Sequence, residues 1–171
     1  MAELFVEIFG KPHGIIVFQL LAACRFTIYL SLIAFIGGGA VACLITLFRI
    51  SKNSSLQRLA ASFIWIFQSV PLLMLLFLIG LGLPRLLDIN IDPWTAATFA
   101  LVLFTSAYLA EVWRGAVESV AKGQWEASFA LNMEYSLLLR KVIIPQALKF
   151  GIAPTVGFMV QIIKGTSLAY I

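Results

Sequence analysis

The chain alternates long apolar stretches with short polar segments, a pattern typical of membrane-spanning helices. Two runs, Thr27–Phe48 and Leu59–Leu83, have the length of about twenty residues that is needed to cross a hydrocarbon layer about 30 Å thick. Trp94–Ala110 is shorter but uncharged, and Ala147–Ile163 is apolar but interrupted by glycine and proline. The pattern therefore predicts an all-α membrane protein with about four transmembrane helices.

The region around the first run predicts two further features. Ile15–Phe26 is apolar with polar interruptions, which suits either an interfacial helix in the headgroup layer or an extension of the first span. Gly38 and Ala42 are four residues apart, a spacing that allows the backbone of a neighbouring helix to approach closely. Because the sequence contains no linker and no repeat, residues 1–171 are expected to form a single transmembrane domain.

The composition excludes an ordinary soluble domain. Hydrophobic residues make up 61% of the chain and charged residues 12%, and the mean hydropathy is +1.01, whereas a soluble domain carries about 25% charged residues. The formal net charge of +4 would suggest nucleic acid as a partner of a soluble protein. In a membrane protein the basic residues report topology instead, so we expect membrane lipid and no nucleic acid as a partner.

The distribution of charge predicts which ends of the spans face the cytoplasm. Basic residues cluster after the first and third runs, at Arg49, Lys52, Arg58, Arg114, Lys122, Arg140, Lys141 and Lys149. The positive-inside rule places both of these loops in the cytoplasm. The opposite ends are balanced or acidic, with Arg85 against Asp88 and Asp92, and Lys11 against Glu3 and Glu7. The N-terminus is therefore expected outside, with the first span acting as the insertion signal.

The second run contains a polar group at membrane depth. Gln68 and Ser69 precede Pro71, which removes a backbone hydrogen bond and kinks a helix. Polar groups at this depth need an internal partner or a water-filled cavity. Two interpretations stay open: these residues line a solute pathway, or Gln68 bonds across to a neighbouring helix and holds the bundle together.

The segment Trp113–Leu148 is far longer than a simple connection between two helices. Its helix-forming residues and apolar spacing predict two short helices, Gln124–Leu131 and Tyr135–Ile144. Asn132 between them suits either a left-handed residue that closes the first helix or a side chain that caps the second. Pro145 is expected to end the second helix or bend it back toward the membrane. The alternative is an amphipathic loop lying on lipid headgroups.

Residues for catalysis or metal binding are scarce. His13 is the only histidine, and Cys24 and Cys43 have no metal-ligand spacing, so we interpret both as small packing residues. No G-x-x-x-x-G-K-[ST] phosphate-binding loop is present. The sequence therefore predicts no catalytic residues, no metal site and no cofactor in this chain.

Two groups of motifs carry a resemblance to a known family. Glu126-Ala127-Ser128, three residues, Asn132, nine residues and Val142-x-Ile144-Pro145 resemble the EAA signature of permease subunits in bacterial ATP-binding cassette (ABC) importers. Three further stretches are similar to the polar amino-acid permeases of that superfamily, namely Ala107–Gly115, Lys122–Ala127 and Lys164–Ala169.

The resemblance implies a multi-pass protein of the bacterial inner membrane, like the permeases of type I ABC importers. The loop at about 113–148 would dock as a coupling helix on a separate cytoplasmic ATPase, which binds the ATP and Mg²⁺. The site residues carried over are Gly123, Glu126, Ala127, Ser128, Asn132 and Pro145, with Glu126 meeting basic groups and Asn132 replacing a glycine. Further implied partners are a second, identical or homologous permease subunit and a periplasmic or lipid-anchored solute-binding protein. The implied cargo is a polar amino acid.

The chain also departs from that family. Many relatives carry Arg-Gly-Thr-Pro where this chain has Gln68-Ser69-Val70-Pro71. Relatives also continue past the Thr-Ser-Leu-Ala stretch with a final span that is expected to be lacking here. A secondary transporter is an alternative, although no ionisable residue lies deep in the three clearest spans. A non-transport membrane scaffold is another, but it explains neither the kinked polar span nor the motif spacing.

Overall fold

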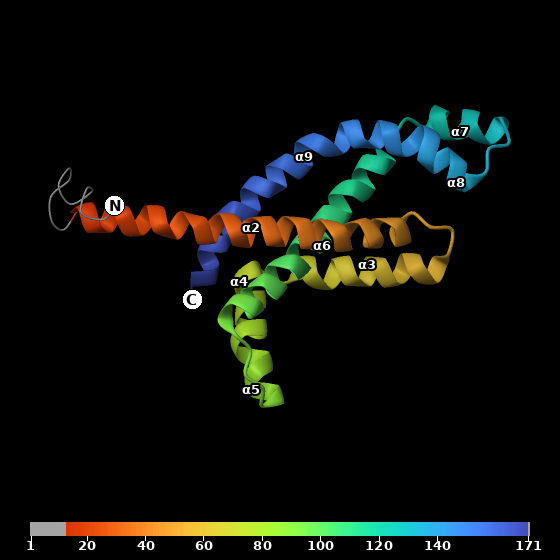
Figure 1. Ribbon diagram of the computed structural model, residues 1–171. Helices are drawn as coiled ribbons and strands as arrows, with labels where there is room; N and C mark the ends of the chain where they lie inside the picture. Colours follow the sequence, from red (N-terminus) through yellow and green to blue (C-terminus); the bar gives the residue numbers. More distant parts are fainter. Residues whose placement is uncertain (1–12, 171) are drawn as a thin grey trace.

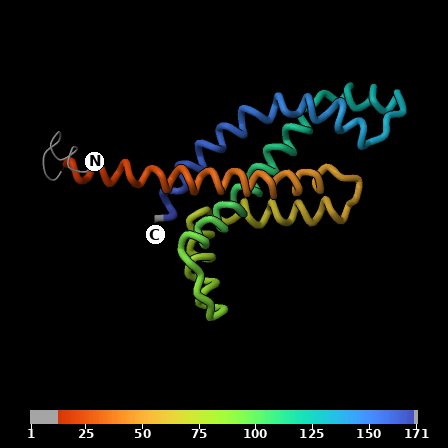
Figure 2. The backbone as a smooth tube through the Cα atoms, viewed as in Figure 1, coloured from red at the N-terminus to blue at the C-terminus, as the bar shows by residue number. Residues whose placement is uncertain are grey.

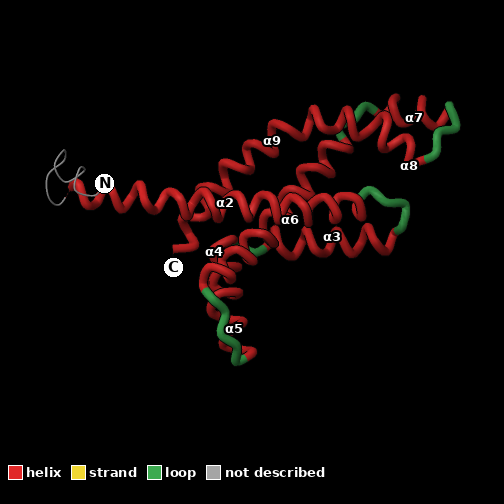
Figure 3. Tube along the Cα trace, in the orientation of Figure 1, coloured by secondary structure: helices red, strands yellow, loops and turns green. Residues whose placement is uncertain are grey.

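A computed structural model describes residues 13–170, and every regular element within that range is a helix (Figure 3). The α-helices are α2 (His13–Arg49), α3 (Ser54–Ser69), α4 (Leu72–Phe77), α5 (Leu83–Leu87), α6 (Pro93–Glu118), α7 (Lys122–Ala130), α8 (Tyr135–Leu138) and α9 (Ile144–Gly165). Two π-helical turns, Leu78–Gly82 and Leu139–Ile143, join α4 to α5 and α8 to α9, and a 3₁₀ turn, Thr166–Tyr170, follows α9.

Three of the four predicted spans lie in long continuous helices. Helices α2 and α6, and the helical run Tyr135–Ala169 that contains α9, are long and apolar enough to cross a membrane. Helix α2 has 37 residues and includes Ile15–Phe26, so this segment extends the first span and is not a separate interfacial helix. Helix α6 continues past the predicted end of the third span to Glu118, which shortens the loop expected at 113–148.

The second predicted span is broken at its proline. Helix α3 ends at Ser69, Val70 is extended with φ −97° and ψ 123°, and the chain resumes as α4 after Pro71. The two halves, Ser54–Ser69 and Leu72–Leu87, are bent by 98°. Because a residue before proline is driven out of the helical region, the predicted kink becomes a sharp bend. The expected number of four spans holds when this bent pair is counted as one.

The basic loops lie together at one end of the molecule. In Figure 1 the turn between α2 and α3 and the α7–α8 region share one end, whereas the start of α2 and the end of α9 lie toward the other. The tube view shows the same path (Figure 2). This arrangement fits the two basic loops facing the same side of a membrane. Glu3, Glu7 and Lys11, which entered the topology prediction, lie outside the described residues.

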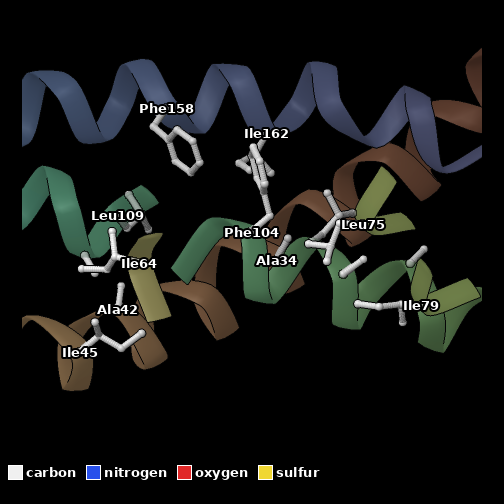
Figure 4. Packing of buried hydrophobic residues seen from close by; sticks show 14 of the residues in the cluster. Ala34, Ala42, Ile45, Ile64, Leu75, Ile79, Phe104, Leu109, Phe158 and Ile162 are labelled. Atoms are coloured by element: carbon white, nitrogen blue, oxygen red, sulfur yellow. The ribbon is translucent and has the colours of Figure 1, made fainter. Parts of the chain in front are cut away.

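Helix α6 forms the centre of the bundle and packs against α2, α3 and α9 (Figure 4). A Cβ on Gly38 of α2 would lie 2.6 Å from the Cβ of Thr105 on α6, and Ala42 has no exposed surface. The close approach predicted from the Gly38 and Ala42 spacing is therefore confirmed. The hydroxyl of Thr46 donates to the carbonyls of Ala42 at 2.8 Å and Ala110 at 3.4 Å, which adds a polar contact between the two helices.

Helices α6 and α9 meet through aromatic side chains. The rings of Tyr108 and Phe158 are stacked with centroids 5.3 Å apart, and Phe104 packs beside them. The indole Nε1–H of Trp113 donates to the hydroxyl of Thr155 at 3.0 Å.

The two cysteines differ from the prediction. Cys24 and Cys43 are exposed on α2, so their interpretation as packing residues is wrong for this chain by itself.

Candidate functional site

Helices α7 and α8 form a helix–turn–helix at the end of the molecule that carries the basic loops (Figure 1). Asn132 in the turn is left-handed, with φ 54°. The N–H of Met133 donates to the Ser128 carbonyl at 3.1 Å, and the N–H of Asn132 donates to the Phe129 carbonyl at 2.9 Å. This pair of bonds defines a Schellman motif, in which a left-handed residue closes a helix. Of the two roles left open for Asn132, closing the first helix is confirmed.

The helix–turn–helix is packed onto the bundle by a small core of its own. Ala116, Val117 and Val120 near the end of α6 pack with Leu138, Ile143 and Ala147, and all six side chains are buried. Trp125 of α7 and Tyr135 of α8 are half-buried against this cluster. A loop that simply lay on lipid headgroups would not need such a core, so the segment is a folded unit fixed to α6 and α9.

The tip of the helix–turn–helix faces away from that core and exposes apolar side chains. Phe129, Leu131 and Leu137 have exposed fractions of 54%, 76% and 45%. We call these three residues the apolar tip. Glu126 and Ala127 of α7 are exposed as well. A cluster of large exposed apolar side chains beside a charged residue is typical of a surface that a partner covers.

The other expected coupling residues differ in their surroundings. Gly123 is exposed, and a Cβ added there would meet no atom within 4 Å. Ser128 is only 4% exposed, and its hydroxyl donates to the Gln124 carbonyl of the same helix at 2.7 Å. Asn132 and Pro145 are exposed. The structure thus places Ser128 on the inner side of α7 and leaves the other residues open to a partner.

Of the two outcomes expected at Pro145, an end of the second helix or a bend toward the membrane, the first is wrong. The chain runs without interruption from α8 through the π-helical turn Leu139–Ile143 into α9, and Pro145 lies in the first turn of α9. Proline has no N–H to donate to the preceding turn, and a wider π-helical turn accommodates that missing bond. One uninterrupted helical run, Tyr135–Ala169, therefore connects the helix–turn–helix to the span in α9.

Several polar links around the helix–turn–helix were not predicted. The side chain of Gln146 in α9 donates to that of Gln124 in α7 at 3.2 Å. Arg114 forms ion pairs with Glu111 and with Glu118, three and four residues away on α6. The spacing of these charges is visible in the sequence and could have revealed the ion pairs, whereas the glutamine pair depends on how α7 packs against α9.

The polar group at the bend between α3 and α4 is partly open. The side-chain amide of Gln68 donates to the carbonyl of Ala107 on α6, at a long distance of 3.4 Å. Ser69 is exposed and donates to the Trp65 carbonyl of its own helix at 2.6 Å. Pro71 is exposed. Gln68 thus has a partner on the neighbouring helix, while Ser69 and Pro71 face outward from this chain.

Membrane-spanning helices with a folded helix–turn–helix at one end define a multi-pass membrane component. Residues 34–171 match the family described as binding-protein-dependent transport system inner membrane component, and the chain belongs to this family. The family assignment agrees with the resemblance read from the EAA-like motif, and it makes the chain a multi-pass inner membrane protein.

Individual relatives are similar to this chain over part of their own length. The chain is 34% identical over 144 residues to the probable amino-acid ABC transporter permease protein YckA of Bacillus subtilis (strain 168), which covers 84% of this chain and 63% of YckA. It is 35% identical over 176 residues to the nopaline transport system permease protein NocM of Agrobacterium fabrum, covering 98% and 70%. The solved structure of an amino acid ABC transporter with histidines has a TM-score of 0.84 and 29% identity, covering 92% of this chain and 74% of that one. The chain thus spans about two thirds of the length of these proteins.

Proposed function

We propose that this chain is the permease subunit of an ATP-driven importer that moves a polar amino acid across the inner membrane. The observation that carries the proposal is the apolar tip, which is exposed on a helix–turn–helix that packs on a buried core at the end of α6. Its position at the basic end of the molecule fits a cytoplasmic partner. The similarity to permeases with amino-acid, nopaline and cystine transport in their names supports an amino acid or a derivative as the cargo.

The partner at the tip is an ATPase subunit, which binds ATP and Mg²⁺ and supplies the free energy. Glu126 contributes a negative charge beside the apolar tip, so the complementary surface carries basic groups around an apolar groove. Helix α7 is joined by the Asn132 turn to α8, which continues into α9, so movement of the ATPase can reach the spans. The enzyme of the complex is that partner, and this chain is its transport subunit.

Two further partners complete the proposed complex. A second permease subunit, identical or homologous, faces this chain across the membrane, and the solute path runs between the two. Gln68 and Ser69 supply polar side chains at membrane depth for that path, and the helix break at Pro71 supplies backbone groups that lack helical partners. A periplasmic or lipid-anchored solute-binding protein delivers the amino acid to the outer end.

The docking of the ATPase is tested by reversing the charge of Glu126. We expect Glu126→Lys to reduce recovery of the ATPase in a pull-down with the purified chain. A fully buried charge pair broken on one side costs about 3–5 kcal/mol, whereas a pair at the rim contributes less than about 1 kcal/mol. The matched control is Lys164→Glu, which reverses an exposed charge at the other end of α9.

The pull-down is repeated across a salt series, because a rim pair is screened by salt and a buried pair much less. A loss of recovery for Glu126→Lys, with none for the Lys164→Glu control, places Glu126 at the docking surface. Recovery equal to that of the wild type at every salt concentration removes Glu126 from the interface.

A further inference from the structure

Tyr135, the first residue of α8, contacts the end of a helix that is distant in the sequence. Its hydroxyl donates to the carbonyl of Ile50 at 2.5 Å, across 85 residues of chain. Ile50 directly follows the last residue of α2. The final carbonyls of an α-helix have no partner within the helix and need one from elsewhere. Tyr135 supplies that partner for the end of α2.

Two more contacts hold the Tyr135 ring at the same place. The ammonium group of Lys52, in the turn after α2, lies over the ring at 4.9 Å from its centre. Ile50 itself packs against the buried cluster beneath the helix–turn–helix. Tyr135 packs against the same cluster, so the half-buried ring combines an apolar contact with the hydrogen bond to Ile50 and the cation–π contact with Lys52.

The connectivity of the chain shows that these contacts join two elements, α2 and the helix–turn–helix, that are not covalently adjacent. The helix–turn–helix is joined covalently to α6 at one end and, through the π-helical turn, to α9 at the other. Helix α2 has no such connection, and it is held to α6 by the close packing at Gly38 and by the bond from Thr46 to Ala110. Tyr135 adds a direct link between α2 and the segment that the partner would move.

We propose that Tyr135 is a positioning residue that ties the end of α2 to the helix–turn–helix, so that a movement of α7 and α8 carries α2 with it. This inference rests on the proposed docking of an ATPase at the apolar tip, because that docking supplies the movement. The contact also has a consequence in the chain alone: it restricts the distance between α2 and α8. The two consequences are measured separately.

The first experiment measures that distance by double electron–electron resonance of the full chain in lipid nanodiscs. Spin labels are attached to Leu44→Cys on α2 and Ser136→Cys on α8, both exposed, after both native cysteines are replaced by serine. We expect one narrow distance distribution for the protein with Tyr135. In Tyr135→Phe the restricted population should fall by about two- to tenfold, the effect of losing one net hydrogen bond. Tyr29→Phe, at an exposed tyrosine of α2, is the matched control.

If the distance distribution of Tyr135→Phe is as narrow as that of the wild type, the proposed link between α2 and α8 through Tyr135 is wrong. A broadened distribution in the Tyr29→Phe control would overturn it equally, because the loss of a hydroxyl elsewhere on α2 would then have the same effect. These outcomes do not depend on any partner, so they decide about Tyr135 even if the proposed function fails.

The second experiment measures amino acid taken up per ATP hydrolysed in proteoliposomes that contain the whole complex. We expect Tyr135→Phe to lower this ratio by about two- to tenfold while ATPase recovery stays at the wild-type value. A purely structural role would lower recovery and stability and leave the ratio unchanged, which refutes the positioning role. Absence of ATP-dependent uptake by the wild type would count against the proposed function instead.

Discussion

Replacing Asn132 with valine is expected to deform the turn between α7 and α8, because Asn132 has φ 54°. A residue with a Cβ pays roughly 1–2 kcal/mol for the left-handed region, and a β-branched residue tolerates it least. The substitution should also weaken the two Schellman hydrogen bonds, from Met133 to Ser128 and from Asn132 to Phe129. Each hydrogen bond contributes about 0.5–1.5 kcal/mol to stability. A change of one or two kcal/mol shifts the population of the native turn by a factor of about 5–30.

Asn132→Gly is the matched substitution, since glycine adopts positive φ without a steric cost. We expect ATP-driven uptake and ATPase recovery close to wild type for Asn132→Gly and several-fold lower values for Asn132→Val. The turn lies outside the bundle, so the thermal stability of the spans should change little in either variant. If valine supports uptake as well as glycine does, Asn132 is not left-handed in the working protein and the assignment of the turn is wrong.

Two further substitutions test the bundle and the solute path. Gly38→Ala should destabilise the bundle by about 1–3 kcal/mol, because the new Cβ would lie 2.6 Å from the Cβ of Thr105. The control Gly157→Ala, whose new Cβ meets nothing within 4 Å, should leave the melting temperature unchanged. Equal melting temperatures of the two variants would contradict the close packing at Gly38. Gln68→Leu should lower uptake while complex assembly and basal ATP hydrolysis persist, since the long bond to Ala107 contributes little; a parallel loss of stability would favour a packing role for Gln68 instead.

The features predicted correctly from the sequence depend on local or periodic properties of the chain. Apolar length identified the spans in α2, α6 and α9. The four-residue spacing of Gly38 and Ala42 identified the face of α2 on which another helix packs, and the tolerance of asparagine for positive φ identified the turn at Asn132. Each of these properties belongs to a few neighbouring residues, so a single sequence contains it.

The features missed depend on how distant segments meet. Pro71 predicted a distortion, but a proline by itself does not specify a bend of 98° between the two halves of the span. Pro145 was expected to end or bend a helix, and the structure has a π-helical turn before it through which the helix continues into α9. The bonds from Tyr135 to Ile50 and from Trp113 to Thr155 join residues 85 and 42 positions apart, which no local pattern specifies.

The most direct test of the account is accumulation of radiolabelled amino acids in proteoliposomes that contain this chain, the proposed second permease subunit and the proposed ATPase. The account predicts accumulation that requires ATP on the ATPase side and solute-binding protein on the other, and that is abolished when the ATPase is omitted. Accumulation driven by an ion gradient without ATP would identify a secondary transporter. An assembled complex that hydrolyses ATP but accumulates no amino acid under any condition would contradict the proposed transport function.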